Sequence, residues 1–188
     1  LFMADGKPEF TGASEQNQIE ALQTYLSRGV KPDVWWLDAG WYPCDYDWPR
    51  IGTWRPDPAR FPNGLTPLGK ACEDNGVQLL LWFEPERVRG GEELDREHPD
   101  WLLSTKDADG NPAGDRLLNL ADPDALHWLI EHVDALIKES HVHIYRQDFN
   151  FDPLPIWVQN EAEDRIGILE NGHAQGYLAY WDALILRN

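Results

Sequence analysis

Apolar residues follow two different spacings along this chain. Three short runs are almost continuously apolar, which is typical of parallel strands covered on both faces. They span 33–41, 77–86 and 142–149. Four other segments repeat apolar residues every three to four positions, which predicts helices. They span 14–29, 65–76, 121–139 and 164–186. We therefore expect the order helix, strand, helix, strand, helix, strand, helix.

Local chemistry sets the ends of two of these helices. Ser14 can cap the first helix by accepting a backbone hydrogen bond, and Gly29 can terminate it. Asp122 can cap the helix over 121–139, and Pro123 suits its first turn. Both boundaries are therefore predicted from capping residues as well as from apolar spacing.

Strands that alternate with helices predict a parallel sheet covered by helices. A Gly-rich phosphate loop does not follow any of the three runs, which argues against a nucleotide-binding doubly wound fold. A complete eight-stranded barrel needs about 250 residues, whereas this chain has 188. We therefore predict an α/β fold of the (β/α)8 TIM-barrel type, with only three or four units present. This half-barrel would form one partial catalytic domain over residues 1–188.

Charge excludes one class of partner. The chain carries 16 basic and 33 acidic residues, a net charge of −17, which would repel a phosphate backbone. Its apolar runs are all shorter than the roughly 20 residues that span a bilayer. Cys44 and Cys72 form no C-x-x-C pair and so predict no zinc site. We expect neither nucleic acid nor a membrane as a partner, and the compartment stays open.

Aromatic residues gather in a stretch punctuated by proline and glycine, which predicts a loop. Ten residues of the chain are tryptophan. Such a loop forms either a small satellite core or a binding surface, and both interpretations stay open. The aromatic residues of this stretch are Trp41, Tyr42, Tyr46, Trp48, Trp54 and Phe61.

Each predicted strand ends in an acidic residue: Asp38, Glu84 and Asp148. In a parallel barrel the carboxyl ends of the strands converge on one mouth, where the chemistry takes place. Strand alternation places Arg146, Asp148 and Asn150 on one face. It likewise places Trp36 with Asp38 and Trp82 with Glu84, so both tryptophans would face the mouth together with the acids. A guanidinium beside Asp148 would keep that carboxylate ionised, as a nucleophile requires. The alternative is that these residues are polar loop residues with a structural ion pair.

Carboxylates beside aromatic residues suit glycoside hydrolysis, which needs one carboxylate as nucleophile or base and one carboxylic acid. The same three acids could hold Mg²⁺ instead. The lysine or histidine base that such an enzyme would need is not present at these strand ends. A glycoside hydrolase is therefore the first hypothesis. A magnesium-dependent barrel enzyme and a catalytically inert carbohydrate-binding or structural half-barrel are the alternatives.

Six motifs together resemble one known family in order and spacing, from about Glu15 onwards. They resemble the α-galactosidases (melibiases) of glycoside hydrolase family 36. This resemblance implies a (β/α)8 barrel, a retaining double displacement on terminal α-galactosides or oligosaccharides, and neither a cofactor nor a metal. The motifs are LDAGWY, IGTWRPDPARFPNGLTPL, LLLWFEPERV, EHPDWLL, LLNLADPDAL and YRQDFN.

The resemblance also assigns site residues by position. Asp148 matches the nucleophile of the family. Asp38 matches the first of two adjacent aspartates that bind galactose hydroxyls, and Arg146 occupies the position of a sugar-binding lysine. The residues assigned to substrate binding are Asp38, Trp54, Arg116, Arg146 and Asn150.

Two positions depart from the family pattern. The second aspartate is Ala39 here, and the lysine is Arg146. A site without one acceptor for a sugar hydroxyl discriminates galactose less strictly. Another α-glycoside, such as an α-N-acetylgalactosaminide, therefore stays open as the substrate.

The family's general acid/base comes from a later strand, and no residue up to Asn188 matches it. Neither Glu84 nor Glu86 is assigned to that role. We therefore expect the acid/base to lie beyond this chain, and the chain alone to show little or no turnover. A half-barrel also exposes a sheet edge, so we expect pairing with a second copy, a homo-oligomer through the open barrel edge.

Overall fold

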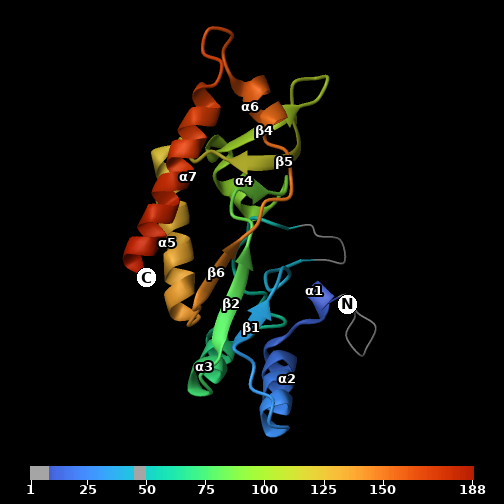
Figure 1. The fold of residues 1–188 in the computed structure, drawn as a ribbon. Coiled ribbons are helices and arrows are strands. Elements are labelled where there is room, and N and C mark those ends of the chain that lie inside the picture. The colour runs from blue at the N-terminus through green and yellow to red at the C-terminus, as the bar shows by residue number, and fades with distance from the viewer. Residues whose placement is uncertain (1–8, 45–49) are drawn as a thin grey trace. The chain divides into compact units, whose positions relative to one another are not determined.

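The computed structural model describes residues 9–44 and 50–188, which form two compact units (Figure 1). Tyr46 and Trp48 of the aromatic stretch lie outside the described residues. The first unit consists of the described parts of Leu1–Arg50, together with Trp54–Phe83 and Ala135–Asp148. The second unit consists of Ile51–Thr53, Glu84–Asp134 and Phe149–Asn188.

The first unit contains the three predicted strands. They are β1 (Val34–Leu37), β2 (Gln78–Phe83) and β6 (Ile144–Gln147). They form a parallel sheet in the order β1-β2-β6, with β1 and β6 at the edges. The predicted strands and their parallel arrangement are therefore confirmed.

Two predicted helices also belong to the first unit. They are α2 (Glu15–Ser27) and α3 (Thr66–Asp74), and the short α1 (Glu9–Gly12) precedes them. The Ser14 side chain caps α2 in a capping box, as its position predicted. Helix α3 packs against β2. The Trp35 indole of β1 donates a hydrogen bond to Gln18 of α2 at 3.2 Å.

The expectation that all three strands are buried on both faces was wrong for β1. Leu79 to Phe83 of β2 are buried, whereas Val34 is 36 % exposed and Trp36 is 52 % exposed. Val34 and Trp36 alternate with Trp35, whose side chain contacts α2. The face of β1 opposite the helices is therefore open among the described residues.

The second unit contains a small antiparallel sheet that the sequence did not predict. Its order is β3-β5-β4, and the short helices α4 (Glu93–Glu97) and η1 (Pro99–Trp101) lie between β3 and β4 in the chain. No apolar run marks these strands. They are β3 (Arg87–Val88), β4 (Leu102–Lys106) and β5 (Pro112–Leu118).

The remaining helices are α5 (Pro123–Glu139), α6 (Leu154–Asn160) and α7 (Ile168–Arg187). Asp122 Oδ1 accepts from the backbone N–H groups of Asp124 and Ala125, so the predicted cap of α5 is confirmed. Helix α5 has residues in both units. Helix α7 begins at Ile168, later than predicted, because the preceding residues form a turn.

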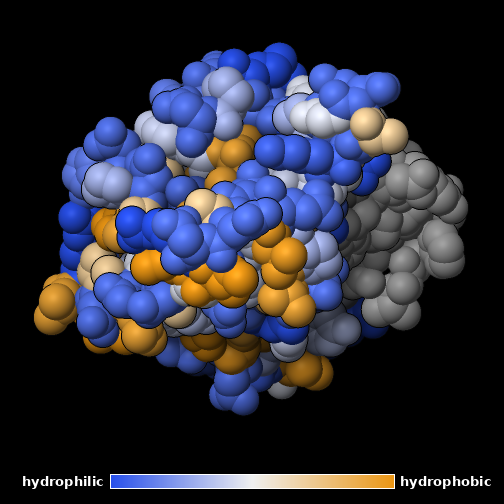
Figure 2. All heavy atoms as spheres, turned by 90° about the horizontal axis from the view of Figure 1, so that it is seen from above, coloured by the Kyte–Doolittle hydropathy of each residue, from blue (hydrophilic) through white to orange (hydrophobic). Residues whose placement is uncertain are grey.

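The surface is mainly hydrophilic on the face shown in Figure 2, with small hydrophobic patches between the polar residues. This agrees with the large excess of acidic residues. Among the described residues, no helix combines the length and the apolar character that a membrane crossing requires.

Candidate active site

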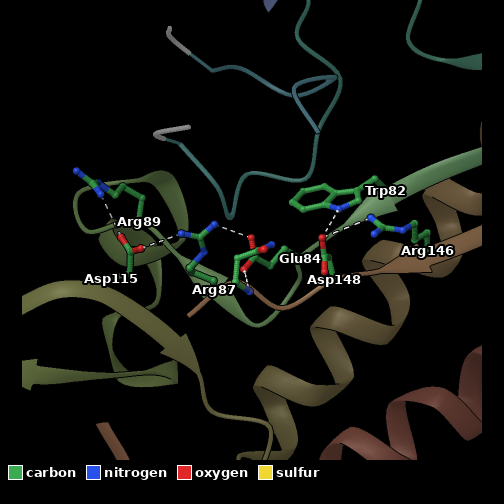
Figure 3. Close-up of polar contacts among 8 residues, drawn as sticks. Trp82, Glu84, Arg87, Arg89, Asp115, Arg146 and Asp148 are labelled. Carbon is green, nitrogen blue, oxygen red and sulfur yellow. Dashed lines mark hydrogen bonds and ion pairs between the residues drawn. The ribbon is translucent and has the colours of Figure 1, made fainter. Parts of the chain in front are cut away.

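Asp148 lies at the carboxyl end of β6 and contacts two side chains of the same sheet (Figure 3). Its Oδ2 accepts a hydrogen bond from the Trp82 indole at 3.1 Å and forms an ion pair with the Arg146 guanidinium at 3.4 Å. Its backbone N–H donates to the Phe83 carbonyl at 2.8 Å, which continues the sheet ladder. The carboxylate side chain is 35 % exposed. It is therefore both fixed in place and accessible.

Arg146 is oriented by an aromatic ring as well as by Asp148. Its guanidinium carbon lies 5.1 Å from the centroid of the Trp36 ring, a cation–π contact. Trp82 and Arg146 are direct partners in the β2–β6 register. The predicted sharing of one face by Arg146 and Asp148 is confirmed. Trp36 and Trp82, which alternation also placed toward the mouth, contact Arg146 and Asp148 respectively.

Asp38 follows β1 in the first unit and is exposed. Its Oδ1 accepts from the Ala39 backbone N–H at 2.7 Å. Ala39, which replaces the second aspartate of the family pattern, is 7 % exposed. The Asp38 side chain therefore remains accessible, whereas its neighbour is buried and has no polar side chain.

The described aromatic residues of the 41–61 stretch form a packed core. Trp41, Tyr42, Trp54 and Phe61 are all at most 2 % exposed. The Trp54 ring lies 5.2 Å from Tyr42 and 6.1 Å from Trp82, centroid to centroid. The satellite-core interpretation therefore holds for these four residues. Trp54 is only 1 % exposed. Its assignment to the sugar pocket stays a prediction.

Glu84, the third strand-end acid, belongs to the second unit and is completely buried. Its Oε2 pairs with the Arg87 guanidinium at 2.6 Å, and its Oε1 accepts from the Asn150 backbone N–H at 2.6 Å (Figure 3). Arg87 also pairs with Asp115 at 3.2 Å. Glu84 therefore has two structural partners and no exposed surface.

Arg116 and Asn150 also lie in the second unit. Arg116 is on β5 and donates to Asp95 at 3.1 Å and to the Gly114 carbonyl at 2.6 Å. The Asn150 residue is exposed, and its backbone is held by Glu84. Both residues therefore have defined contacts within the second unit.

Glu86 lies two residues after Glu84 and is also buried. It pairs with His173 of α7 at 2.8 Å, which joins two segments of the second unit.

No group of three or more histidine, cysteine, aspartate or glutamate residues suited to hold a metal ion occurs in 9–44 and 50–188.

Sequence reasoning did not predict the contact between the Trp82 indole and Asp148. Alternation placed Trp82 on the face that Glu84 shares, toward the barrel mouth, but the contact itself depends on the register between β2 and β6. The alternation of side chains along β2 was the only signal for it, because that alternation puts Trp82 on the face that the register shares with Arg146.

Comparison with known proteins gives a family match over most of the chain. The family model described as Melibiase matches residues 13–166. A probable α-galactosidase C of Aspergillus flavus is 35 % identical over 136 residues, which cover 65 % of this chain and 18 % of that protein. The α-galactosidase AgaA of Geobacillus stearothermophilus is 30 % identical over 139 residues, covering 73 % and 19 %. The chain thus spans about a fifth of the length of these relatives.

Solved structures agree in fold. The crystal structure of the GH36 α-galactosidase AgaA from Geobacillus stearothermophilus matches with a TM-score of 0.79 at 24 % identity, over 94 % of this chain and 25 % of that one. The α-galactosidase from Lactobacillus brevis matches with a TM-score of 0.77 at 22 % identity, over 93 % and 23 %. The α/β fold of this chain is therefore that of a portion of these TIM-barrel enzymes. By its match to the family model over most of its length, the chain belongs to the melibiase family of α-galactosidases.

Proposed function

We propose that this chain forms the nucleophile-bearing part of a retaining α-galactosidase, with Asp148 as the nucleophile. The observation that carries the proposal is the Asp148 carboxylate, which accepts from the Trp82 indole and the Arg146 guanidinium and remains 35 % exposed. Donors to a carboxylate favour its ionised form, which is the form that attacks the anomeric carbon.

The proposed reaction has two steps. In the first, an Asp148 oxygen forms a bond to the anomeric carbon of a terminal α-galactoside while the bond to the leaving oxygen breaks, and an acid protonates that oxygen. In the second, water attacks the anomeric carbon of the glycosyl-enzyme and gives a proton to the acid of the first step, which is now deprotonated. The bond between that carbon and Asp148 breaks, which frees the carboxylate. Relatives of this fold have been solved with raffinose and with stachyose, which supports oligosaccharides with terminal galactose as the substrate class.

The proton donor is proposed to come from a residue that is not part of this chain. Glu84, the buried strand-end acid, is engaged by Arg87 and by the Asn150 backbone. The chain spans about a fifth of the length of its curated relatives, so a later strand of a longer polypeptide has room to supply the acid. In this proposal the 188-residue chain is a half-barrel with little or no turnover of its own.

Sugar binding is assigned to Asp38, Trp54, Arg116, Arg146 and Asn150 in this proposal. Among them, Asp38 and Arg146 carry polar groups in the same unit as Asp148. Ala39 offers no carboxylate at the second aspartate position, so the specificity for galactose over other α-glycosides is expected to be relaxed.

Replacement of Asp148 by asparagine tests the nucleophile. In a longer polypeptide that carries a complete catalytic domain, Asp148→Asn should lower hydrolysis of an aryl α-galactoside by more than about 1,000-fold, because asparagine cannot form the glycosyl ester. Galactose affinity, measured by calorimetric titration, should change little. Asp152→Asn, an exposed substitution in the following segment, is the matched control. Wild-type turnover in Asp148→Asn would overturn the assignment.

A second candidate function is self-association of this chain. Strand β1 lies at the edge of its sheet and exposes Val34 and Trp36, and a groove of about 260 Å³ lies beside it. An exposed strand edge can pair with the same edge of a second copy. The residues that line this groove are Tyr25, Val30, Pro32, Val34, Trp35 and Trp36.

A further inference from the structure

Glu84 is a fully buried acid whose two carboxylate oxygens are both paired. Its side chain is 0 % exposed, and each carboxylate oxygen has one strong partner. Oε2 meets the Arg87 guanidinium at 2.6 Å, and Oε1 meets the backbone N–H of Asn150 at 2.6 Å. Removing a carboxylate from water costs free energy. This cost is offset only when both oxygens are paired, as they are in Glu84.

Arg87 is itself fixed from several sides. Its second amino group pairs with Asp115 at 3.2 Å, and its guanidinium carbon lies 6.0 Å from the centroid of the Phe151 ring. Arg87 therefore contacts the side chain of the residue after Asn150, while Glu84 holds the Asn150 backbone. The pair clamps the segment 150–151 through two adjacent residues.

We propose that Glu84 is a positioning residue that fixes the backbone of Asn150, and thereby the orientation in which the Asn150 side chain binds the sugar. Asn150 follows the proposed nucleophile by two residues and is exposed, so its side chain is free to meet a ligand while its backbone is held. The inference rests on the proposed function, since it gives a purpose to a sugar contact of Asn150.

The chemistry requires a carboxylate at this position. Two donors face the side chain, one from Arg87 and one from the Asn150 backbone. A glutamine has one acceptor oxygen and one donor amide group, so one of the two contacts would become a donor facing a donor. Glu84→Gln therefore keeps the volume of the side chain and releases one end of the clamp.

Hydrogen exchange of the backbone amides in this 188-residue chain tests the clamp directly. Glu84→Gln should speed exchange of the Asn150 amide by at least about 10-fold, because this amide then faces either a neutral oxygen, which is a weaker acceptor than a carboxylate, or an amide group that only donates. Glu86→Gln is the matched control, because Glu86 is equally buried in the same loop and pairs with His173 instead. It should leave exchange at 149–151 unchanged. Should Glu84→Gln fail to fold, Glu84→Asp keeps the charge but shortens the reach toward Asn150.

A double-mutant cycle on galactose affinity tests the purpose of the clamp. Calorimetric titration of this chain should give an affinity about 5- to 10-fold weaker for Glu84→Gln. In an Asn150→Ala background the same substitution should have no further effect, because the side chain that Glu84 orients is gone. A purely structural role would instead weaken binding equally in both backgrounds.

The outcomes separate the two proposals. If the wild-type chain binds no galactose, the proposed function fails, and the sugar-positioning role fails with it. If the wild-type chain binds, Asn150→Ala weakens binding and Glu84→Gln does not, the positioning inference alone is overturned. Unchanged exchange at the Asn150 amide in Glu84→Gln, or equal losses of affinity in both backgrounds, would also overturn it.

Discussion

At the scale of single residues, Asp148 accepts from two donors of different kinds. The Arg146 guanidinium brings a full positive charge at 3.4 Å, and the Trp82 indole brings a neutral N–H at 3.1 Å. Trp82 is completely buried, so its N–H has a fixed direction, whereas the Arg146 side chain is 35 % exposed and screened by solvent. We infer that Trp82 orients the carboxylate and that Arg146 contributes charge.

Replacement of Trp82 by phenylalanine tests this division of roles. The substitution keeps an aromatic ring in the β2 position and removes the only N–H of the side chain. In a longer polypeptide that carries a complete catalytic domain, Trp82→Phe should lower kcat/KM for an aryl α-galactoside about 10-fold or more, since a hydrogen bond to a charged group contributes roughly 1.5–3 kcal/mol.

Trp35→Phe is the control for that measurement. The Trp35 indole donates to Gln18 of α2, on the opposite face of the sheet from Trp82. It should therefore leave kcat/KM close to the wild-type value. Equal losses in the two variants would mean that the effect of Trp82 is general destabilisation and not orientation of Asp148.

Individual site residues were predictable where strand alternation alone decides the position. The shared face of Arg146 and Asp148 follows from their spacing of two along one strand. The contact between Trp82 and Asp148 depends on the register of two strands 66 positions apart, which local sequence does not specify. The contact of Glu84 with Asn150 was also missed. It joins residues 66 positions apart, and Asn150 donates through its backbone, so its residue type carries no signal for the contact.

At the scale of elements, strong apolar periodicity and caps allowed a correct prediction, and weak periodicity did not. The caps at Ser14 and Asp122 were predicted from residue type and are present. The β3-β5-β4 sheet was missed, because its strands are short and partly exposed and carry no regular apolar pattern.

Glycines in α7 lowered its helical propensity, yet they have a packing role there. A Cβ at Gly176 would lie 1.9 Å from the Leu120 carbonyl oxygen, and one at Gly172 would lie 2.7 Å from the Ala121 Cβ. These glycines therefore let α7 approach the chain before α5 closely, a tertiary requirement that propensity does not report.

Glu161 gives α7 a pH-dependent N-terminal cap. Its carboxylate accepts from the Gly167 and Leu169 backbone N–H groups, each at 2.8 Å. The hydrogen bond from Gly167 lowers the pKa of Glu161 below its usual range. A carboxyl group whose pKa is lowered by folding stabilises the folded state at pH values above its ordinary pKa. This contribution is lost as the pH falls through the lowered pKa.

Thermal unfolding of Glu161→Gln by circular dichroism tests this cap. At pH 7 the midpoint should fall by a few degrees, because glutamine cannot accept both bonds as a carboxylate. The difference from wild type should shrink as the pH is lowered through the pKa of Glu161. Glu163→Gln, an exposed neighbour, should show no such trend. A constant difference from pH 7 down to pH 3 would contradict the assignment.

At the scale of the whole molecule, an open sheet face and a large net charge act in opposite directions. Val34 and Trp36 leave apolar surface exposed along the β1 edge, which favours association. The net charge of −17 on each copy opposes it through repulsion. Because salt screens charge over roughly 8 Å at 0.15 M and 3 Å at 1 M, added salt should tip this balance toward association.

Sedimentation velocity of the 188-residue chain tests association through β1. The dimer fraction should rise with protein concentration and with salt. Val34→Lys places a charge on the exposed edge, so it should return the chain to monomer at concentrations at which wild type is at least half dimeric. Leu178→Lys introduces the same charge at a site 63 % exposed on α7, and it should leave the dimer unchanged. Loss of the dimer in both variants would show that net charge and not the β1 edge controls association, and a wild-type chain that stays monomeric in 1 M salt would rule out pairing at this edge.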